Sequence, residues 1–417
     1  MTKALLHHRV ASFRGLAICA LLTACSSLTE PGGQPSAALT ALPRPLSVGE
    51  QKVVSATNEF SFSLFRELSA AQKDSNVFTS PLSASFALGM AMNGAANATL
   101  DQMRSTLAYG AATDTEINAG YKGLIALLRG LDNTVDVRIA NGIWYRNTYT
   151  VKQPFLDAGR TYFDAQAAAL DFNSPSAPAT VNAWVNSATA GKIPTIVTTL
   201  TDLDMILVNA IYFKGSWRQR FDPAETTDEQ FHGIAGDQPM RLMHHKASVA
   251  FTSNASYSAV DLPYGDSAYV MTAVVPSNGV SIDVVAASLM QGDAWNGMLG
   301  QMRPAHVDVF IPKLTLEWER LLNVDLIALG MRDAFNDVTA DFSRLSLQPS
   351  FISYVKQKTY VDINEEGTEA AAVTAVGIVA TSAEINPQFR ADHPFLFVIR
   401  ERLTGTIMFM GRIVRMP

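Results

Sequence analysis

Cysteine is nearly absent from this chain, which has two in 417 residues, Cys19 and Cys25. Both lie close to the N-terminus, so the rest of the chain cannot form an intramolecular disulfide. A long chain without disulfides relies on a large apolar core for its stability. The composition fits that requirement, because 48% of the residues are hydrophobic and 17% are charged, as in folded globular proteins.

An excess of positive charge is also missing. The formal net charge is −6, and no run of Lys and Arg is dense enough to form a basic face. Since nucleic-acid binding needs such a face, we expect no nucleic-acid partner.

Catalytic and metal-binding patterns are missing as well. None of the seven histidines falls in a His-Glu-x-x-His pattern, and the chain has neither a Gly-x-Ser-x-Gly elbow nor a Gly-rich phosphate loop. The adjacent Glu365 and Glu366 have no apolar surroundings that would separate their pKa values for acid and base roles. We therefore expect no enzyme activity, no metal and no cofactor.

The N-terminus has the pattern of a targeting segment. A positive region with Lys3, Arg9 and Arg14 precedes a short apolar run, residues 15–24, that is too short to span a bilayer. The run ends in Leu22-Thr23-Ala24-Cys25, which resembles the bacterial lipobox, where cleavage precedes a Cys that becomes lipid-modified. The alternative is an ordinary signal peptide with an incidental Cys.

These features predict the organisation of the whole chain. Residues 1–24 are the expected signal peptide, and residues 25–46, rich in Ser, Pro, Gly, Thr and Ala, are the expected flexible tether. Residues 47–417 show no repeat and no inner linker, so we expect a single domain. The mature protein would be exported and lipid-anchored through Cys25 to the bacterial cell envelope or surface.

The order of expected elements within the domain indicates an α+β fold. Helical periodicity dominates the first part, and mostly antiparallel strands follow, with late strands closing onto early ones. Residues 205–213 are apolar on both faces, which is typical of a central buried strand. Asn209 is its one strongly polar side chain and should have a specific hydrogen-bond partner.

Residues 365–382 form an unusually bland stretch between two patterned segments, and after Glu369 they carry no charge. One alternative is an Ala-rich helix, because Ala is the best helix former. The other is a loop able to become a strand, since Gly367, Gly377 and several β-branched residues disfavour a helix. Strand alternation would place Thr368 and the small or apolar residues that alternate with it on one face, which could enter a sheet without burying a charge.

The start of this stretch, Glu-Glu-Gly-Thr-Glu-Ala-Ala-Ala at residues 365–372, is similar to the hinge of the serpins, the serine protease inhibitor family. Further segments resemble family landmarks in the same order, and the match covers roughly residues 47–417. They are residues 76–83, 182–185, 189–193, 207–217, 262–264, 311–313 and 389–397.

The resemblance implies a serpin fold of three mostly antiparallel β-sheets with about nine helices and an exposed reactive-centre loop. It also implies a suicide-substrate mechanism. A target serine protease cleaves the loop and forms a covalent acyl-enzyme. The freed loop then inserts as a new strand into the large sheet and traps the protease. The inhibitor would act as a monomer and needs no catalytic residue of its own.

Residue roles follow from the same resemblance. The hinge residues are Glu365, Gly367, Thr368, Glu369, Ala370, Ala371 and Ala372. Ser80, Ser83, Asn209 and Gln357 match the polar cluster beneath the sheet opening, and Trp217 matches the aromatic where insertion begins. Glu365 and Lys313 match a salt bridge at the loop base. Gln357 departs from the family pattern, which often has His at this place, and we expect altered strain with retained hydrogen bonding.

The cleaved bond follows from two counts that disagree. Counting forward from Gly367 gives Thr381–Ser382, which we favour, and counting back from Pro394 gives Ala383–Glu384. Either choice places a small uncharged residue before the bond, which suits elastase-like or subtilisin-like proteases. The alternative function is a non-inhibitory serpin that acts as a binding or structural surface protein.

Overall fold

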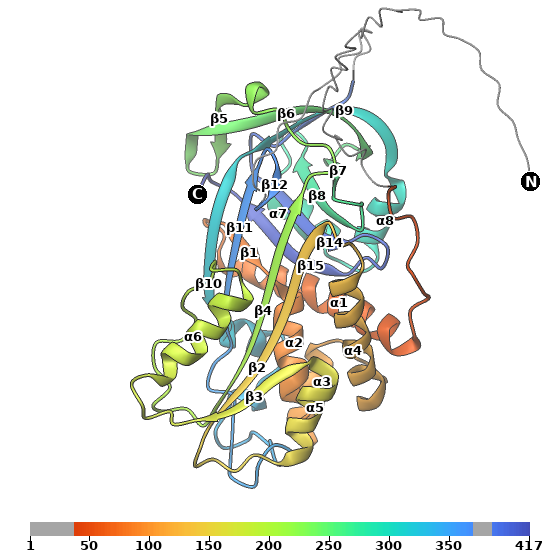
Figure 1. Cartoon of the computed structure of the whole chain (residues 1–417). Coiled ribbons are helices and arrows are strands. Elements are labelled where there is room, and N and C mark those ends of the chain that lie inside the picture. Colours follow the sequence, from red (N-terminus) through yellow and green to blue (C-terminus); the bar gives the residue numbers. More distant parts are fainter. Residues whose placement is uncertain (1–36, 370–385) are drawn as a thin grey trace, which may run out of the picture. The chain divides into compact units, whose positions relative to one another are not determined.

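The computed structural model describes residues 37–369 and 386–417, and these residues form an α+β fold (Figure 1). The expected signal peptide, Cys25 and residues 25–36 of the expected tether lie outside the described residues. Among the described residues, no helix combines the length and apolarity needed to cross a membrane.

Nine α-helices occur within the described residues, and most of them come before residue 190. α1 begins after Ser47, whose side chain forms a capping box with Glu50, and α2 begins after Ser80 with Pro81 in its first turn, as the sequence predicts. The helices are α1 Val48–Ala71, α2 Pro81–Met92, α3 Asn97–Thr106, α4 Asp114–Gly130, α5 Gln153–Phe163, α6 Ala177–Ala188, α7 Ile282–Leu289, α8 Ala294–Gln301 and α9 Asn323–Ala328.

The large sheet has six strands in the order β10-β11-β12-β4-β2-β3. All neighbours are antiparallel except β2 and β3, which are parallel. The strands are β10 Leu314–Leu321, β11 Lys356–Asn364, β12 Gly367–Thr368, β4 Met205–Ser216, β2 Val135–Arg146 and β3 Ala165–Leu170. The central position of β4 confirms the buried strand that the sequence predicts.

The other described strands form one nine-stranded sheet, where the resemblance implies two separate sheets. The reason is β6, an 18-residue strand that pairs with β5 along its first part, with β9 from Leu242 to Phe251, and with β7 near its end. Its hydrogen bonds make the two expected sheets continuous. The strands are β1 Val77–Thr79, β5 Thr227–Gly233, β6 Gly236–Ser253, β7 Tyr257–Tyr264, β8 Tyr269–Pro276, β9 Arg303–Pro312, β13 Gln388–Arg390, β14 Phe395–Glu401 and β15 Ile407–Ile413.

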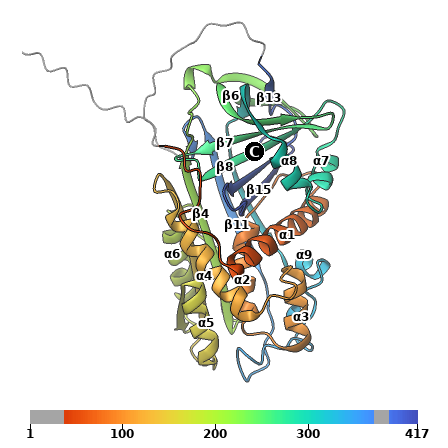
Figure 2. The same ribbon diagram turned by 90° about the vertical axis from the view of Figure 1, so that its right-hand side faces the viewer.

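The two faces of the large sheet are covered by different helices. Side chains of α6 pack with Trp144 of β2 and Ala210 of β4 in one apolar cluster, whereas α2 packs between β4 and β15 on the opposite side (Figure 2). β1 pairs with β15, and Phe78 stacks on Phe397 and Phe409, so early and late parts of the chain close onto each other as expected.

The described part of the expected tether, residues 37–46, contacts the domain. The backbone amide of Leu39 donates to the carbonyl of Asp266 at 2.7 Å, and the Arg402 guanidinium donates to the carbonyl of Leu39. Arg44 donates to the Glu50 carboxylate at 2.7 Å. This part of the segment is therefore fixed on the domain surface by specific hydrogen bonds, where the composition predicts a flexible tether.

Candidate functional site

The hinge residues Gly367 and Thr368 already form a strand, β12, inside the large sheet (Figure 1). After β11 the chain turns at Glu365 and Glu366 and runs back antiparallel, so that Thr368 lies opposite Ile363. On its other side β12 pairs with the end of β4, with Thr368 opposite Gly215. Gly367 and Thr368 therefore lie between β11 and β4.

Gly367 fits this position because it has no side chain. A Cβ atom there would lie 2.1 Å from the carbonyl oxygen of Gly215 and 2.6 Å from Cα of Ser216. Its φ of 152° is also unfavourable for other residues. The close approach of the two backbones is what allows β12 to pair with β4.

Thr368 points into the core, on the face that strand alternation predicts. It is 2% exposed, and its hydroxyl lies 2.8 Å from the hydroxyl of Tyr264. A charged side chain at this position would be buried without a partner, so the second residue of β12 must be small and uncharged.

The base of the loop has the expected ion pair. Lys313 Nζ lies 2.7 Å from the Glu365 carboxylate, which also accepts a hydrogen bond from the hydroxyl of Thr226. Burial raises the pKa of Glu365, but the hydrogen bonds from Lys313 and Thr226 outweigh it and lower the pKa overall. The carboxylate is therefore held charged at the start of the turn into β12.

Trp217 forms two hydrogen bonds with the turn between β11 and β12. Its indole Nε1 donates to the carbonyl of Asn364 at 2.8 Å, and its backbone amide donates to the carbonyl of Glu366 at 2.8 Å. Its ring stacks on Tyr264 with a centroid distance of 4.4 Å. One aromatic pair thus supports both the turn and the buried Thr368.

The polar cluster beneath the sheet is centred on Gln357 of β11. Its Oε1 accepts hydrogen bonds from the Thr79 hydroxyl at 2.5 Å and the Ser80 amide at 3.1 Å, and its Nε2 donates to the Ser80 carbonyl at 2.7 Å. The Ser83 hydroxyl donates to the Asn209 carbonyl at 3.5 Å. Gln357 therefore retains the hydrogen bonding expected of it and ties β11 to the start of α2.

Asn209 has the specific partner that its position in an apolar strand predicts. Its Nδ2 donates to Oδ1 of Asn141 in β2 at 2.7 Å, while its Oδ1 is buried without a hydrogen bond. Asn209 is thereby fixed to β2, on the side of β4 that faces away from β11.

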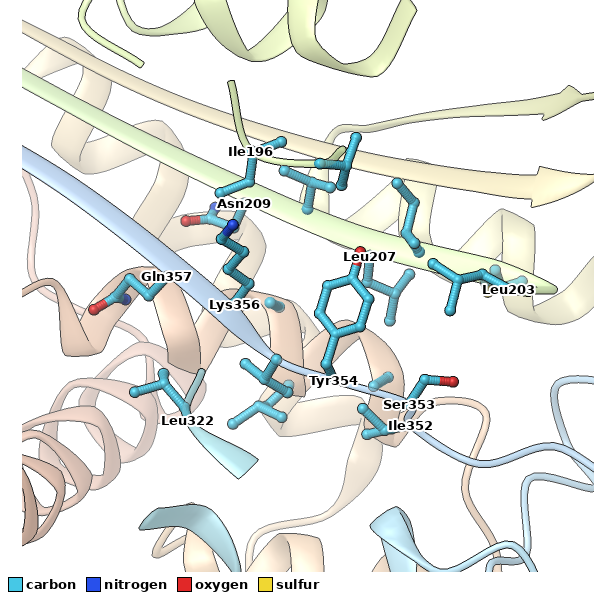
Figure 3. A pocket seen from close by; sticks show the side chains of 18 of the residues that line it. Ile196, Leu203, Leu207, Asn209, Leu322, Ile352, Ser353, Tyr354, Lys356 and Gln357 are labelled. Carbon is cyan, nitrogen blue, oxygen red and sulfur yellow. The ribbon is translucent and has the colours of Figure 1, made fainter. Parts of the chain in front are cut away.

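A cavity of about 210 Å³ lies between β4 and β11, beyond the short β12 (Figure 3). Leu207 of β4 and Leu203 of the segment before β4 line the cavity. Tyr354 enters it from the segment that leads into β11. Ile196, from the segment after α6, covers it. Its lining is mostly apolar, so the space next to β4 could accept small apolar side chains of a further strand.

Some predicted residues lie outside the described residues: Ala370, Ala371, Ala372, Thr381, Ser382, Ala383 and Glu384. Their roles stay predictions. The sequence did not predict three contacts at the site. They are those of Thr79 with Gln357, of Asn141 with Asn209, and of Tyr264 with Thr368. The Leu-Pro-Tyr segment at residues 262–264 was the available signal for Tyr264. Within the described residues, no cluster of His, Cys, Asp and Glu is suited to a metal ion.

These features define a class of protein in which a loop hinge enters a large sheet between two strands. Comparison with known proteins gives the family. The model of the family described as serpin (serine protease inhibitor) matches residues 55–416, and this chain belongs to that family.

Relatives and solved structures agree with this assignment. The chain is 34% identical to an uncharacterized serpin-like protein of Thermococcus kodakarensis, over 88% of this chain and 87% of that protein. It is 33% identical to the human leukocyte elastase inhibitor, over 87% of this chain and 99% of that protein. The native-state structure of tengpin, a thermophilic serpin, has a TM-score of 0.79 at 28% identity, covering 91% of this chain and 98% of that one. The structure of human thyroxine-binding globulin in complex with thyroxine has a TM-score of 0.80 at 27% sequence identity, covering 88% of this chain and 99% of that one.

Proposed function

We propose that this protein inhibits serine proteases as a suicide substrate. The observation that carries the proposal is β12, a two-residue strand that begins the loop and already lies between β11 and β4. The adjoining cavity extends along the same space between these strands. The residues from 370 to 383 carry no charge, so this segment could continue into the sheet after it is cut.

The proposed reaction uses the catalytic serine of the target protease. Its hydroxyl attacks the carbonyl carbon of Thr381, the amide bond to Ser382 breaks, and the protease histidine transfers the serine proton to the leaving amine of Ser382. The product is an ester between Thr381 and the protease serine. Insertion of residues 370 onward beside β4 would then move the protease and distort its active site before water hydrolyses the ester.

The favoured targets are elastase-like or subtilisin-like proteases. The residue before the bond is Thr381, or Ala383 in the alternative with Glu384 after the bond, and both are small and uncharged. Shallow specificity pockets accept such side chains, whereas a trypsin-like protease needs Lys or Arg. The similarity to a protein named leukocyte elastase inhibitor supports the same class.

The test is incubation with a neutrophil- or pancreatic-type elastase. We expect a covalent complex that survives denaturant in wild type, and its loss in Thr368→Arg, because the buried site beside Tyr264 cannot hold an unpaired charge. Thr368→Ser keeps the hydroxyl and should still form the complex. Cleavage of wild type without any complex would instead support a non-inhibitory serpin that binds other partners.

We also propose that the protein is exported and anchored to the bacterial cell envelope by a lipid on Cys25. The support is the Leu22-Thr23-Ala24-Cys25 pattern after a positive and then apolar N-terminus. Labelling with a radioactive fatty acid should mark wild type and not Cys25→Ser. Equal labelling of both proteins would exclude Cys25 as the site.

A further inference from the structure

Glu369 directly follows β12 and is the last residue described before position 386. Its backbone amide still donates to the carbonyl of Asp362 at 3.1 Å, so it belongs to the end of the β11–β12 pairing. Its φ is 59°, in the left-handed region that is unfavourable for a residue with a Cβ. Continuation of β12 as a strand requires Glu369 to leave this conformation for an extended one.

The side chain of Glu369 is buried although it carries a carboxylate. It is 5% exposed and lies at a small cavity of about 20 Å³ between β4 and β11. Tyr212 of β4 and Tyr360 of β11 line the same space. The carboxylate therefore occupies the position between the two strands that directly follows Thr368.

Lys192 supplies the opposite charge. Its Nζ lies 3.4 Å from the Glu369 carboxylate and 4.5 Å from the centroid of the Tyr360 ring, and it donates to the Tyr360 hydroxyl at 3.4 Å. Lys192 follows α6, and its backbone amide is held by the carbonyl of Thr189 at 3.0 Å. The ion pair thus joins the helix that covers the sheet to the hinge inside it.

The electrostatics agree with a mutual interaction. Burial lowers the pKa of Lys192, but the charge of Glu369 and the hydrogen bond to Tyr360 raise it overall. Burial together with the carboxylate of Glu369 raises the pKa of Tyr212. The pKa shifts of Lys192 and Tyr212 therefore agree with the close contact that both side chains make with the Glu369 carboxylate.

We propose that Glu369 and Lys192 form a latch that limits β12 to two residues and sets the rate at which the strand is extended by further insertion. To pass this point, the carboxylate must leave Lys192 and Tyr212 while the Glu369 backbone becomes extended. The latch therefore contributes to the barrier for insertion, both before cleavage and after it. Its consequence for inhibition rests on the proposed function, but the latch itself does not.

The first test needs no protease. We expect Glu369→Ala and Lys192→Met to convert to a loop-inserted form, with a raised urea midpoint, roughly tenfold faster than wild type on warming, because each removes a charge-assisted contact. Hydrogen exchange in residues 356–368 should rise before conversion. Combining the two changes should add little, since both remove the same interaction.

Two controls separate the latch from a general loss of stability. Lys192→Arg keeps the charge and should convert at the wild-type rate. Lys52 of α1 forms an exposed ion pair with Glu116 of α4, and its Nζ lies 2.7 Å from the carboxylate. Lys52→Met removes this ion pair and should also leave the rate unchanged. Conversion of Glu369→Ala at the wild-type rate, or equal acceleration by Lys52→Met, would overturn the proposal.

A protease assay then separates this proposal from the proposed function. If wild type forms no covalent complex with elastase while Glu369→Ala still converts faster, inhibition is wrong and the latch stands. If wild type forms the complex and neither latch variant changes the conversion rate, the latch is wrong and inhibition stands.

Discussion

Gly367 shows how one residue without a side chain determines the state of the hinge. Its neighbours leave no space for a Cβ, because the carbonyl oxygen of Gly215 would be 2.1 Å away. The pairing of β12 with β4, and with it the buried position of Thr368, depends on this close approach.

Gly367→Ala should therefore expel β12 from the sheet. The backbone conformation alone costs about 1 kcal/mol or more for Ala, and the clash adds to it. Hydrogen–deuterium exchange should show faster exchange in residues 363–368. Gly300→Ala is a matched control, because a Cβ at Gly300 in α8 meets nothing within 4 Å. Unchanged exchange in Gly367→Ala would contradict this account of the hinge.

His393 gives the molecule a pH dependence away from the hinge. Its Nδ1 lies 2.8 Å from the Asp392 carboxylate, and its Nε2 lies 3.0 Å from the carbonyl of Pro276. The bond to Asp392, opposed by burial and aided by the Pro276 carbonyl, raises the pKa of His393. The Asp392 carboxylate also accepts a hydrogen bond from the Arg390 guanidinium, so it is the counter-charge for both Arg390 and the protonated His393.

The sign of the effect follows from the raised pKa. The stabilisation is fully present below the unfolded pKa, about 6.5, and is lost as the pH rises through the folded pKa. His393→Gln should lower the urea midpoint clearly at about pH 5.5 and much less at about pH 8.5. A difference that is the same at both pH values would show that the charge of His393 contributes nothing.

Residue types predicted much of the site but not its geometry. The family pattern identified Gly367, Thr368, Gln357 and the ion pair of Glu365 with Lys313, because each role follows from size or charge. The role of Glu369 was not predictable. Strand alternation places it only on the face opposite to Thr368, whereas its backbone is left-handed and its side chain is buried beside the distant Lys192.

At the scale of elements, β11 is tied to α2 through one side chain. Gln357 makes its hydrogen bonds to Thr79 and Ser80, directly before α2 begins. These bonds lie beside the cavity between β4 and β11, and they fix one edge of the opening into which a strand would insert.

Gln357→Ala should destabilise the native fold by about 2–3 kcal/mol, because it leaves buried polar groups of Thr79 and Ser80 without partners. Gln357→His should recover part of this loss through a ring nitrogen. The urea midpoint of the first unfolding transition measures both. A midpoint for Gln357→Ala equal to that of wild type would show that the cluster does not hold β11.

The elements themselves were predictable to different degrees. Helix starts such as Ser80-Pro81 and the apolar strand at residues 205–213 carry local signals, and both are confirmed. The short β12 carries no local signal, since two residues have no periodicity. The continuity of β6 across two expected sheets is also a long-range property, which depends on the partners of an 18-residue strand.

At the scale of the whole molecule, the large sheet combines an inserted hinge with an adjoining cavity. β12 separates β4 from β11 over two residues, and a cavity of about 210 Å³ follows between them. A sheet in this state gains hydrogen bonds and apolar contacts when a further strand fills the space. We infer that the intact protein stores free energy that cleavage of the loop can release.

Thermal unfolding of the protein before and after cleavage of the loop tests this claim most directly. The loop is cut with a non-target protease at catalytic amounts, the two fragments are kept together, and the midpoint is measured by circular dichroism. The account predicts a midpoint well above that of the intact protein, with Thr368→Arg showing no such rise. A midpoint for the cleaved wild type that is equal to or below that of the intact protein would contradict it.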